Sequence, residues 1–199
     1  MAGDGCLSRY KNKYVISISG NLKDDKLFYD KIIIPLLNKL RLKKTKYRIR
    51  PDWNKIEINF SDKLFFDKLK NLGFPVGKKL NQTLLLPKKL KNYASYFVAG
   101  LIATDGCIWF RTKNYKRPYP VIGIKNKCKT LVYQTYNFLR LLNLNPKLRE
   151  VKLRNNPKSG AYEIAIYGHK NFNRFINLVG FVNPKHKLKY KTFLKESSF

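Results

Sequence analysis

The sequence predicts an α+β protein made of two pseudo-twofold-related units, each an antiparallel sheet with helices on one face. An Asp-Gly pair occurs at Asp4 and again at Asp105, and strand-like sequence follows it both times. The order helix, hairpin, helix, hairpin, helix then runs through each half, an αββαββα plan. Short stretches also recur, since Val-Ile-Ser-Ile at 15–18 returns as Val-Ile-Gly-Ile at 121–124. These repeats indicate an internally duplicated chain.

The first repeat, expected at residues 1–92, is organised by two hairpins. Apolar and polar residues alternate in four strand-like segments, at 6–10, 14–19, 47–50 and 55–60. From Leu22 to Leu42 apolar residues recur at helical spacing, and Pro35 should kink or interrupt that helix. A last helix is expected over 64–72, capped by Ser61 or Asp62 and ended by Gly73.

The second repeat, expected at residues 93–199, follows the same plan. Its first helix should end at Asp105, because Gly106 would take the left-handed conformation just past the last turn. The carboxylate would then oppose the helix macrodipole, which is unfavourable unless a cation offsets it. The plain alternative is an Asp-Gly turn after a core helix. The remaining expected elements are strands at 107–111, 119–125, 147–154 and 162–167, and helices at 128–142 and 171–180.

The charge balance points to a nucleic-acid partner. Lys and Arg number 42 against 12 Asp and Glu, and the resulting formal net charge of +30 suits a polyanion. The basic residues are spread over every segment instead of following one membrane-binding helix, and no run of 18 apolar residues occurs. The three cysteines and two histidines lack disulfide or zinc spacing. We expect an intracellular protein, in the cytoplasm or nucleoid of a prokaryote or in an organelle.

The alternation in the strands separates the charge from the core. In the expected hairpins one face carries mostly Ile and Phe, and the opposite face carries Arg, Lys, Asn, Ser, Tyr and Trp. Hairpin ribbons can enter the major groove and read base edges with such side chains, although an ordinary solvated face is the alternative for any one strand. The residues expected to face DNA are Ser8, Tyr10, Ser17, Ser19, Arg48, Arg50, Lys55, Glu57, Asn59, Trp109, Arg111, Lys113, Arg117, Lys125, Lys147, Arg149, Lys152, Arg154, Glu163 and Tyr167.

The nonapeptide at 98–106, Val-Ala-Gly-Leu-Ile-Ala-Thr-Asp-Gly, resembles the signature of the LAGLIDADG homing endonucleases. With a second Asp-Gly at the head of an equivalent repeat, the resemblance covers essentially the whole chain. It implies a monomer in which two signature helices pack together at the axis, where Ala99 and Gly100 would permit close approach. It also implies a site-specific endonuclease that makes a staggered double-strand break in a long, asymmetric DNA target. Because 199 residues leave no room for protein-splicing domains, we expect an intron-borne or free-standing gene.

The resemblance further implies a divalent-metal site. Each signature helix of the family delivers one acidic residue to the scissile phosphates, which carries over to Asp4 and Asp105. The carbonyls of Gly3 and Thr104 are expected to add metal ligands. Mg²⁺ is the expected cation because it prefers carboxylate, carbonyl, water and phosphate oxygen. Mn²⁺ is expected to substitute for it, and Ca²⁺ to bind without supporting cleavage.

Family members also place a polar residue and a lysine near the attacking water. In the second repeat these positions correspond to Asn126 and Lys127, whereas in the first they fall on Gly20 and Asn21, a departure from the pattern. The family pattern Pro-x-x-Lys-Leu-Lys resembles residues 184–189, which nominates Lys189 as support for the first or a shared centre. Lys79 is its weaker counterpart in the first repeat. For any single lysine in so basic a chain, plain solvation is the alternative.

The first signature helix is represented only by the residues 1–5, Met-Ala-Gly-Asp-Gly. Two interpretations stay open: residues upstream of Met1 belong to the protein, or Met1 is the start and the helix pair is short. A helix of one turn is marginal by itself, which favours the first interpretation. Under the second, Asp4 would be poorly held and cleavage of one strand would be in doubt.

Two other functions fit the basic composition. One is non-catalytic binding, as by an intron RNA-splicing maturase or a DNA-binding regulator, in which case intron RNA is an expected partner. The other is a basic structural protein of a ribonucleoprotein, for which the internal repeat would have no purpose. Mg²⁺-dependent cleavage that disappears in Asp105→Asn would favour the endonuclease, and sequence-indifferent binding with a steep salt dependence would favour the structural protein.

Overall fold

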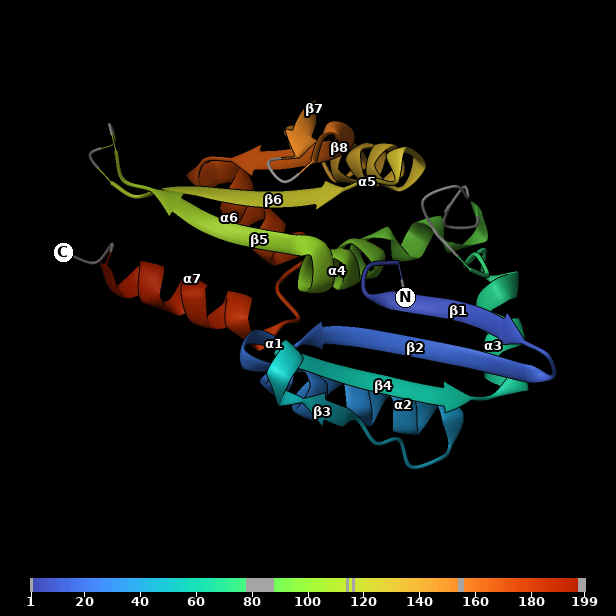
Figure 1. The fold of residues 1–199 in the computed structure, drawn as a ribbon. Helices are drawn as coiled ribbons and strands as arrows, with labels where there is room; N and C mark the ends of the chain where they lie inside the picture. The colour runs from blue at the N-terminus through green and yellow to red at the C-terminus, as the bar shows by residue number, and fades with distance from the viewer. Residues whose placement is uncertain (1, 78–87, 114, 116, 154–155, 197–199) are drawn as a thin grey trace. The chain divides into compact units, whose positions relative to one another are not determined.

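The computed structural model describes residues 2–77, 88–113, 115, 117–153 and 156–196, and it divides the chain into two compact units (Figure 1). Unit 1 comprises Met1–Pro87 together with Asn183–Lys185, and unit 2 comprises Lys88–Val182 with His186–Phe199. Each unit holds one four-stranded antiparallel sheet, in the order β1-β2-β4-β3 and β5-β6-β8-β7. The expected α+β class with two repeated units is confirmed.

Unit 1 contains the two predicted hairpins with helices on one face of their sheet. Its strands are β1 (Gly5–Tyr10), β2 (Lys13–Asn21), β3 (Arg48–Arg50) and β4 (Lys55–Ser61). Its helical segments are α1 (Leu22–Phe28), the π-helical turn η1 (Tyr29–Ile33), α2 (Ile34–Arg41), the 3₁₀ turn η2 (Pro51–Trp53) and α3 (Lys63–Asn71). Residues 2–4 are not helical.

The interruption expected at Pro35 is present, one turn earlier than the proline itself. Pro35 lies in the first turn of α2, and the Ile34 amide bonds the Tyr29 carbonyl across a π turn. Proline has no N–H to give to the carbonyl four residues before it, so the preceding turn widens. The wider turn places Tyr29 in the core, where its side chain is buried with Leu37, Ile56 and Ile58.

A helix cap links the second hairpin of unit 1 to α3. The Asp62 carboxylate accepts a hydrogen bond from the Phe65 amide at 3.0 Å, so Asp62 is the N-cap. The Arg41 guanidinium donates to the same carboxylate at 3.2 Å and lies 3.5 Å from the centre of the Phe60 ring. Gly73 follows the helix with a φ of 86°, as its expected role at the C-terminus requires.

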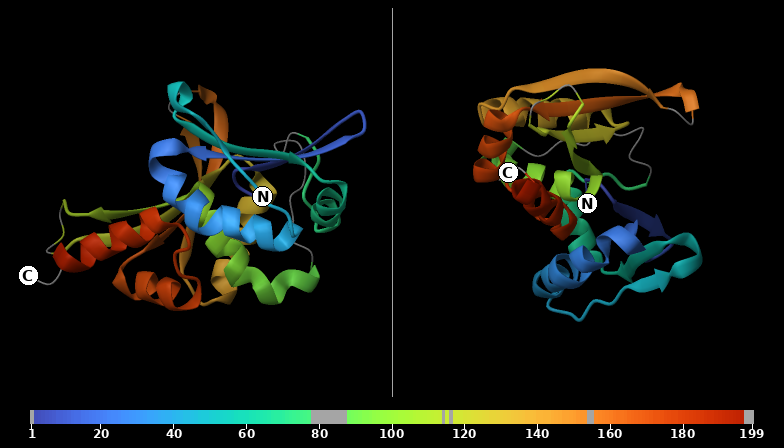
Figure 2. Two further views of the ribbon diagram at one scale, coloured as in Figure 1. Left: turned by 90° about the horizontal axis from the view of Figure 1, so that it is seen from below. Right: turned by 90° about the vertical axis from the view of Figure 1, so that its left-hand side faces the viewer.

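Unit 2 repeats the plan and adds elements at both ends. Its strands are β5 (Gly106–Arg111), β6 (Tyr119–Asn126), β7 (Pro146–Leu153) and β8 (Asn156–Tyr167). Its helical segments are η4 (Lys88–Tyr93), α4 (Ala94–Asp105), α5 (Lys129–Leu141), α6 (His169–Leu178) and α7 (Pro184–Glu196). Figure 2 shows the β7–β8 hairpin extending well beyond the helices of its own unit. No helix in the described part of the chain is long and apolar enough to cross a membrane.

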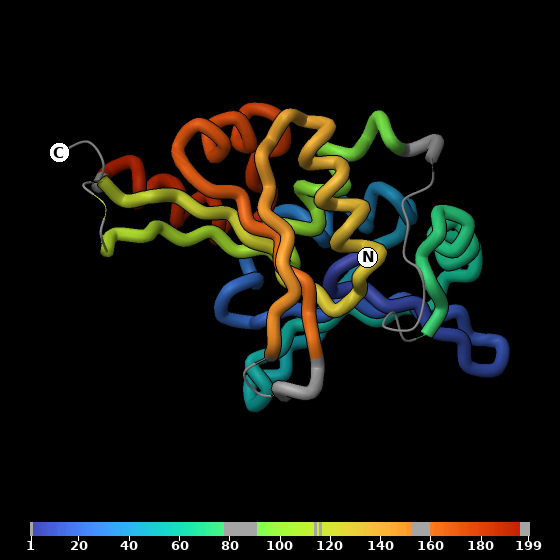
Figure 3. The backbone as a smooth tube through the Cα atoms, turned by 90° about the horizontal axis from the view of Figure 1, so that it is seen from above, coloured from blue at the N-terminus to red at the C-terminus, as the bar shows by residue number. Residues whose placement is uncertain are grey.

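Helix α7 was not predicted, and aromatic packing explains its position. Its Phe193 ring stacks on Phe110 of β5 with centroids 4.0 Å apart, and its Tyr190 ring contacts Phe172 of α6 at 5.6 Å. Figure 3 shows α7 running beside the β5–β6 hairpin. Basic residues dominate the sequence of α7, which is typical of a solvated tail. Burial of the Phe193 side chain nevertheless fixes α7 against the sheet.

The two sheets share one register. In unit 1, Ile18 of β2 pairs with Ile58 of β4, and in unit 2 Ile124 of β6 pairs with Ile164 of β8. All four partners lie on the helix-covered side, and three of them are fully buried. Any position on one sheet can therefore be matched to its counterpart on the other.

Candidate active site and nucleic-acid interface

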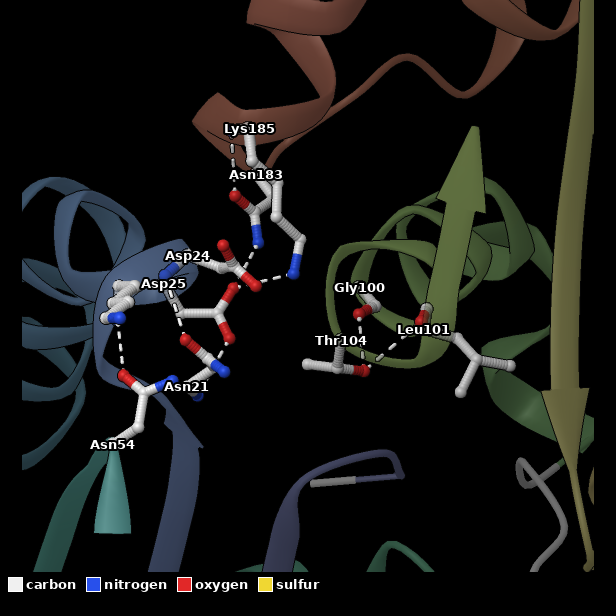
Figure 4. Close-up of polar contacts among 10 residues, drawn as sticks. Asn21, Asp24, Asp25, Asn54, Gly100, Leu101, Thr104, Asn183 and Lys185 are labelled. Carbon is white, nitrogen blue, oxygen red and sulfur yellow. Dashed lines mark hydrogen bonds and ion pairs between the residues drawn. The ribbon is translucent and has the colours of Figure 1, made fainter. Parts of the chain in front are cut away.

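Asp105 is the last residue of α4 and lies half-buried at the helix C-terminus. The helix is apolar on nearly every side, and Val98, Leu101 and Ile102 are buried, so the carboxylate ends a rigid core element. Just before it, the Thr104 hydroxyl donates to the carbonyls of Leu101 and Gly100 at 3.1 and 3.3 Å (Figure 4). The helix offers the Thr104 carbonyl no partner, because the residue four positions on belongs to β5.

Asn126 braces the Asp105 carboxylate. The amide nitrogen Nδ2 of Asn126 donates to Asp105 Oδ2 at 2.7 Å, and Oδ1 of the same side chain accepts from the Cys128 backbone amide at 2.8 Å. Both ends of the Asn126 side chain are thus fixed, and Cys128 is the N-cap of α5. The structure brings together two residues that the sequence nominated on the basis of resemblance, and it gives Asn126 an orienting contact.

Gly106 does not take the expected left-handed conformation. Its φ and ψ are −89° and 159°, so the chain passes straight from α4 into β5. A glycine is needed for a different reason: a Cβ at this position would lie 2.6 Å from the Ile102 carbonyl oxygen and 2.7 Å from Ile102 Cα. The signature glycine therefore permits a close backbone approach directly beside the acidic residue.

Asp4 precedes β1 in unit 1 and is exposed. Its carbonyl accepts a hydrogen bond from the Ser19 amide at 3.3 Å. At the position equivalent to Asn126 stands Gly20, which has no side chain to hold a carboxylate, and Tyr29 takes the space: a Cβ on Gly20 would meet the Tyr29 ring at 2.9 Å. Burial raises the pKa of the Tyr29 hydroxyl, and the negative charges of Asp4 and Asp25 raise it further.

A cluster of polar side chains that the sequence did not reveal surrounds Asp25, close to Gly20. Asp25 is buried, and its carboxylate accepts from Lys185 Nζ at 2.8 Å and Asn183 Nδ2 at 3.1 Å. Its other oxygen accepts from the Asn21 amide at 3.1 Å. Figure 4 shows Asn183 and Lys185 pointing toward Asp25. Because the partners are distant in sequence, no local pattern could have identified them.

The nominated lysines fall in different places. Lys127 follows β6 and is exposed, next to the braced pair in unit 2. Lys189 also belongs to unit 2, where its Nζ donates to the Ile108 carbonyl at 3.4 Å, three residues beyond Asp105. The lysine of α7 that belongs to unit 1 is instead Lys185. Lys79 lies outside the described residues.

The face of the unit 1 sheet opposite the helices carries the expected polar residues. Strand pairing sets Ser17 beside Asn59, and Ser19 and Arg48 on either side of Glu57. Arg50 pairs with Lys55 at the end of the same face, and its guanidinium lies 5.4 Å from the centre of the exposed Trp53 ring. By the same alternation, the residues on this face are Ser8, Tyr10, Ser17, Ser19, Arg48, Arg50, Lys55, Glu57 and Asn59.

Unit 2 places most of its nominated residues on one face, with one exception. Arg111 lies over the Tyr167 ring at 5.2 Å, and Trp109 covers Gly123, where a Cβ would come within 2.7 Å of the indole. Lys152 alternates with the residues of that face and lies on the opposite side of β7, which corrects the expectation for it. The residues that share the face are Trp109, Arg111, Lys125, Lys147, Arg149, Glu163 and Tyr167. Lys113 and Arg117 are exposed in the β5–β6 loop, and Arg154 lies outside the described residues.

The residues present fit a hard divalent cation. Within the described part of the chain no group of three or more His, Cys, Asp or Glu side chains could hold a metal. The two nominated carboxylates, Asp4 in unit 1 and Asp105 in unit 2, each follow a residue whose main-chain carbonyl is also nominated as a ligand, Gly3 or Thr104. Mg²⁺ keeps several waters and commonly binds one or two carboxylates plus substrate phosphates, so a sparse oxygen set of this kind suits it better than it suits zinc.

One family model matches part of the chain. Residues 92–180 match the model of the LAGLIDADG-like domain. The resemblance drawn from the nonapeptide is confirmed, and the acidic residue of the LAGLIDADG signature is the one that Asn126 braces. No curated protein matches the chain by sequence.

Solved structures of a homing endonuclease and of two meganucleases extend the likeness to both units. The crystal structure of I-DmoI in complex with DNA and Ca has 19% identity and a TM-score of 0.58, covering 95% of this chain and 92% of that chain. The LAGLIDADG meganuclease I-AabMI bound to uncleaved DNA has 15% identity and a TM-score of 0.60, covering 98% and 87%. The meganuclease I-SmaMI bound to uncleavable DNA has 10% identity and a TM-score of 0.60, covering 97% and 86%. The chain has the LAGLIDADG homing-endonuclease fold.

Proposed function

We propose that the chain is a site-specific DNA endonuclease that hydrolyses phosphodiester bonds with the help of a divalent cation. The observation that carries this proposal is the braced carboxylate of Asp105, fixed by Asn126 at the end of a buried helix and followed at once by a basic sheet. A carboxylate held in one orientation by a 2.7 Å hydrogen bond is suited to binding a cation. The net charge of +30 and the polar sheet faces suit double-stranded DNA with a long target.

The residues of unit 2 have distinct roles in this reaction. When bound, Mg²⁺ would activate water and neutralise charge that develops on the phosphate. Asp105 and the Thr104 carbonyl would hold it, and Asn126 would keep the carboxylate in one orientation. Lys127, exposed just beyond the strand, would donate to a phosphate oxygen or to the attacking water. The related I-DmoI has been crystallised with DNA and Ca and with DNA and Mn, which agrees with an oxygen-preferring cation.

The two units support unequal cleavage rates. Asp4 would act on one strand and Asp105 on the other, giving a staggered double-strand break, and Gly3 would offer its carbonyl as Thr104 does. Gly20 stands at the position equivalent to Asn126, so the hydrogen bond that orients Asp105 has no exact counterpart in unit 1. Preorganised geometry lowers the barrier, and displacement of a catalytic group by about 1 Å can cost about 100-fold in rate. We expect a nick at the strand served by Asp105 before the second cut.

The test uses the full chain and a pool of randomised linear duplex DNA, incubated with Mg²⁺ and sequenced at the new ends. The wild type should cut a restricted set of sequences, with offset breaks on the two strands. Asp105→Asn should bind the same sequences in a gel shift and lose cleavage of one strand, and EDTA should abolish all cleavage. Asn126→Ala should slow the same strand without abolishing the cut.

Asp4→Asn is the matched variant for the other strand. It should remove the slower cut and leave the faster one, so that nicked product accumulates. If the wild type shifts DNA or intron RNA without cutting in Mg²⁺ or Mn²⁺, and Asp105→Asn behaves identically, the proposal is wrong and the chain is a binder.

A further inference from the structure

Two glutamates occupy equivalent positions on the two polar sheet faces. The chain has only 12 acidic residues against 42 basic ones. Glu57 lies on β4 opposite Ser19 and Arg48, and Glu163 lies on β8 opposite Lys125 and Arg149. Each precedes the isoleucine of β4 or β8 that pairs with Ile18 or Ile124, so the shared register makes the two glutamates counterparts.

In unit 1 the glutamate joins two cations. Glu57 Oε1 accepts from Arg50 Nε at 2.8 Å, and Oε2 lies 2.7 Å from Lys55 Nζ. The Glu57 side chain is only 8% exposed, against 40% for Arg50 and 34% for Lys55. The hydrogen bond from Lys55, followed by that from Arg50, lowers the Glu57 pKa to about 2, so the carboxylate is ionised at neutral pH. It lies under its cations and lines a pocket of about 320 Å³ together with Lys46, Tyr47, Arg48, Arg50 and Asn59.

In unit 2 the same position makes the same kind of contact. Glu163 Oε1 accepts from Arg149 Nη2 at 2.8 Å, and here too the glutamate is the less exposed partner, 16% against 62%. The pair raises the pKa of the Arg149 guanidinium, through the hydrogen bond first and the charge of Glu163 second. The two arginines are not at equivalent positions, because Arg149 lies directly opposite Glu163 whereas Arg50 lies opposite Lys55. Each arginine nevertheless bonds to the less exposed glutamate of the neighbouring strand.

A carboxylate on a DNA-facing surface is repelled by phosphates, so its presence at both positions needs a reason. An arginine has five donors in a planar fork, and bidentate recognition of guanine needs the fork in one orientation. A free arginine must lose side-chain entropy to reach that orientation when it binds. The bond to Glu57 uses Nε of Arg50 and leaves the Nη pair, an edge suited to guanine O6 and N7. The bond to Glu163 uses one N–H of Arg149 Nη2 and leaves the other donors of that guanidinium.

We propose that Glu57 and Glu163 are positioning residues for DNA readout, which fix the orientations of Arg50 and Arg149 and so increase sequence discrimination while lowering general DNA affinity. This inference rests on the proposed site-specific DNA recognition. It replaces the expectation that the two glutamates contact DNA themselves. The ion pair between Lys55 and Glu57 likewise orients the Lys55 ammonium group, a second donor on the same face.

The experiment measures binding without cleavage. The full-length protein is equilibrated in EDTA with randomised duplex DNA, and the bound and free fractions are sequenced. Glu57→Gln should lower discrimination about 10-fold at base pairs in one half of the recognised site, because a good bidentate contact is worth about 1–3 kcal/mol. Glu163→Gln should do so in the other half. Both variants should bind bulk random DNA at least as tightly as the wild type, since a negative charge is removed.

Glu150→Gln is the matched control. Glu150 lies on β7 next to Arg149, is exposed, and by alternation lies on the opposite face of the sheet. It removes the same charge and should leave discrimination unchanged. An equal loss of sequence discrimination in Glu57→Gln, Glu163→Gln and Glu150→Gln would overturn the inference, because removal of a negative charge alone would then explain the loss.

Two further outcomes are decisive. If Glu57→Gln unfolds, as urea titration would show, Arg50→Lys keeps the charge and removes the fork, and it should lose the same half-site discrimination; retained discrimination in that variant would refute the inference. A wild type that binds every sequence equally would also refute it. Selective binding without cleavage in Mg²⁺ would overturn the proposed catalysis and leave this inference standing.

Discussion

Replacing Gly106 by alanine should destabilise unit 2 and displace its carboxylate. The new Cβ would lie 2.6 Å from the Ile102 carbonyl oxygen, whereas ordinary contact begins near 3.4 Å, so backbone atoms must separate by about 0.8 Å. Overpacking of this kind costs about 1–3 kcal/mol. We expect the free energy of unfolding, measured by circular dichroism in urea, to fall by that amount.

Gly100→Ala is the matched control on the same helix. A Cβ built on Gly100 meets no atom of the described residues within 4 Å, and alanine is favoured over glycine inside a helix by about 1 kcal/mol. This variant should therefore be slightly more stable than the wild type.

In cleavage assays Gly106→Ala should cut one strand about 100-fold more slowly, because Asp105 moves with its neighbour. Wild-type stability and wild-type cleavage in Gly106→Ala would refute the reasoning.

Three other predictions follow from polar contacts in unit 1. Asp62→Ala should lower the free energy of unfolding by about 1–2 kcal/mol in urea, because the Phe65 amide loses its N-cap acceptor. An NMR titration of the Glu57 carboxylate should give a midpoint near pH 2. Its ion pairs should stabilise the fold fully above about pH 4.3, the pKa of a glutamate in the unfolded chain, and this stabilisation should be lost as the pH falls through 2. Lys185→Met should cost about 1–2 kcal/mol, since the buried Asp25 loses a charged donor.

Each of these has a nearby comparison. Asp52→Ala removes an exposed acidic residue outside any helix cap and should leave stability within about 0.5 kcal/mol of the wild type. Lys187→Met removes an exposed cation two residues beyond Lys185 and should behave likewise. A normal Glu57 titration near pH 4 would show that its two ion pairs do not persist in solution. Equal effects of Lys185→Met and Lys187→Met would show that the contact with Asp25 contributes nothing measurable.

Local sequence patterns predicted much of this fold. Alternation located both hairpins of unit 1, because one face of each sheet is buried and the other is polar. The resemblance to the LAGLIDADG homing endonucleases nominated Asp105 and Asn126, which the structure joins by a hydrogen bond. Pro35 predicted an interruption of the helix, and the structure has a π-helical turn at Tyr29–Ile33, just before the proline.

Features that depend on distant partners were not predictable in this way. Helix α7 has a basic sequence without a clear apolar face, and it is held by Phe193 stacking on a ring of β5. β8 begins at Asn156, several residues earlier than expected, because the sequence from Pro157 to Gly160 lacks alternation. The partners of Asp25 lie far along the chain, and the role of Glu57 depends on side-chain geometry that alternation cannot give.

The placement of Asn183–Lys185 has a consequence for how such proteins can be recombined. Unit 1 is not one continuous stretch, because its buried Asp25 is satisfied by residues that follow almost all of unit 2. A fragment ending at Pro87, or an exchange of the first repeat as a single block, would leave that carboxylate without two of its donors. If the first repeat of this chain were exchanged, Asn183 and Lys185 would therefore have to be exchanged with it.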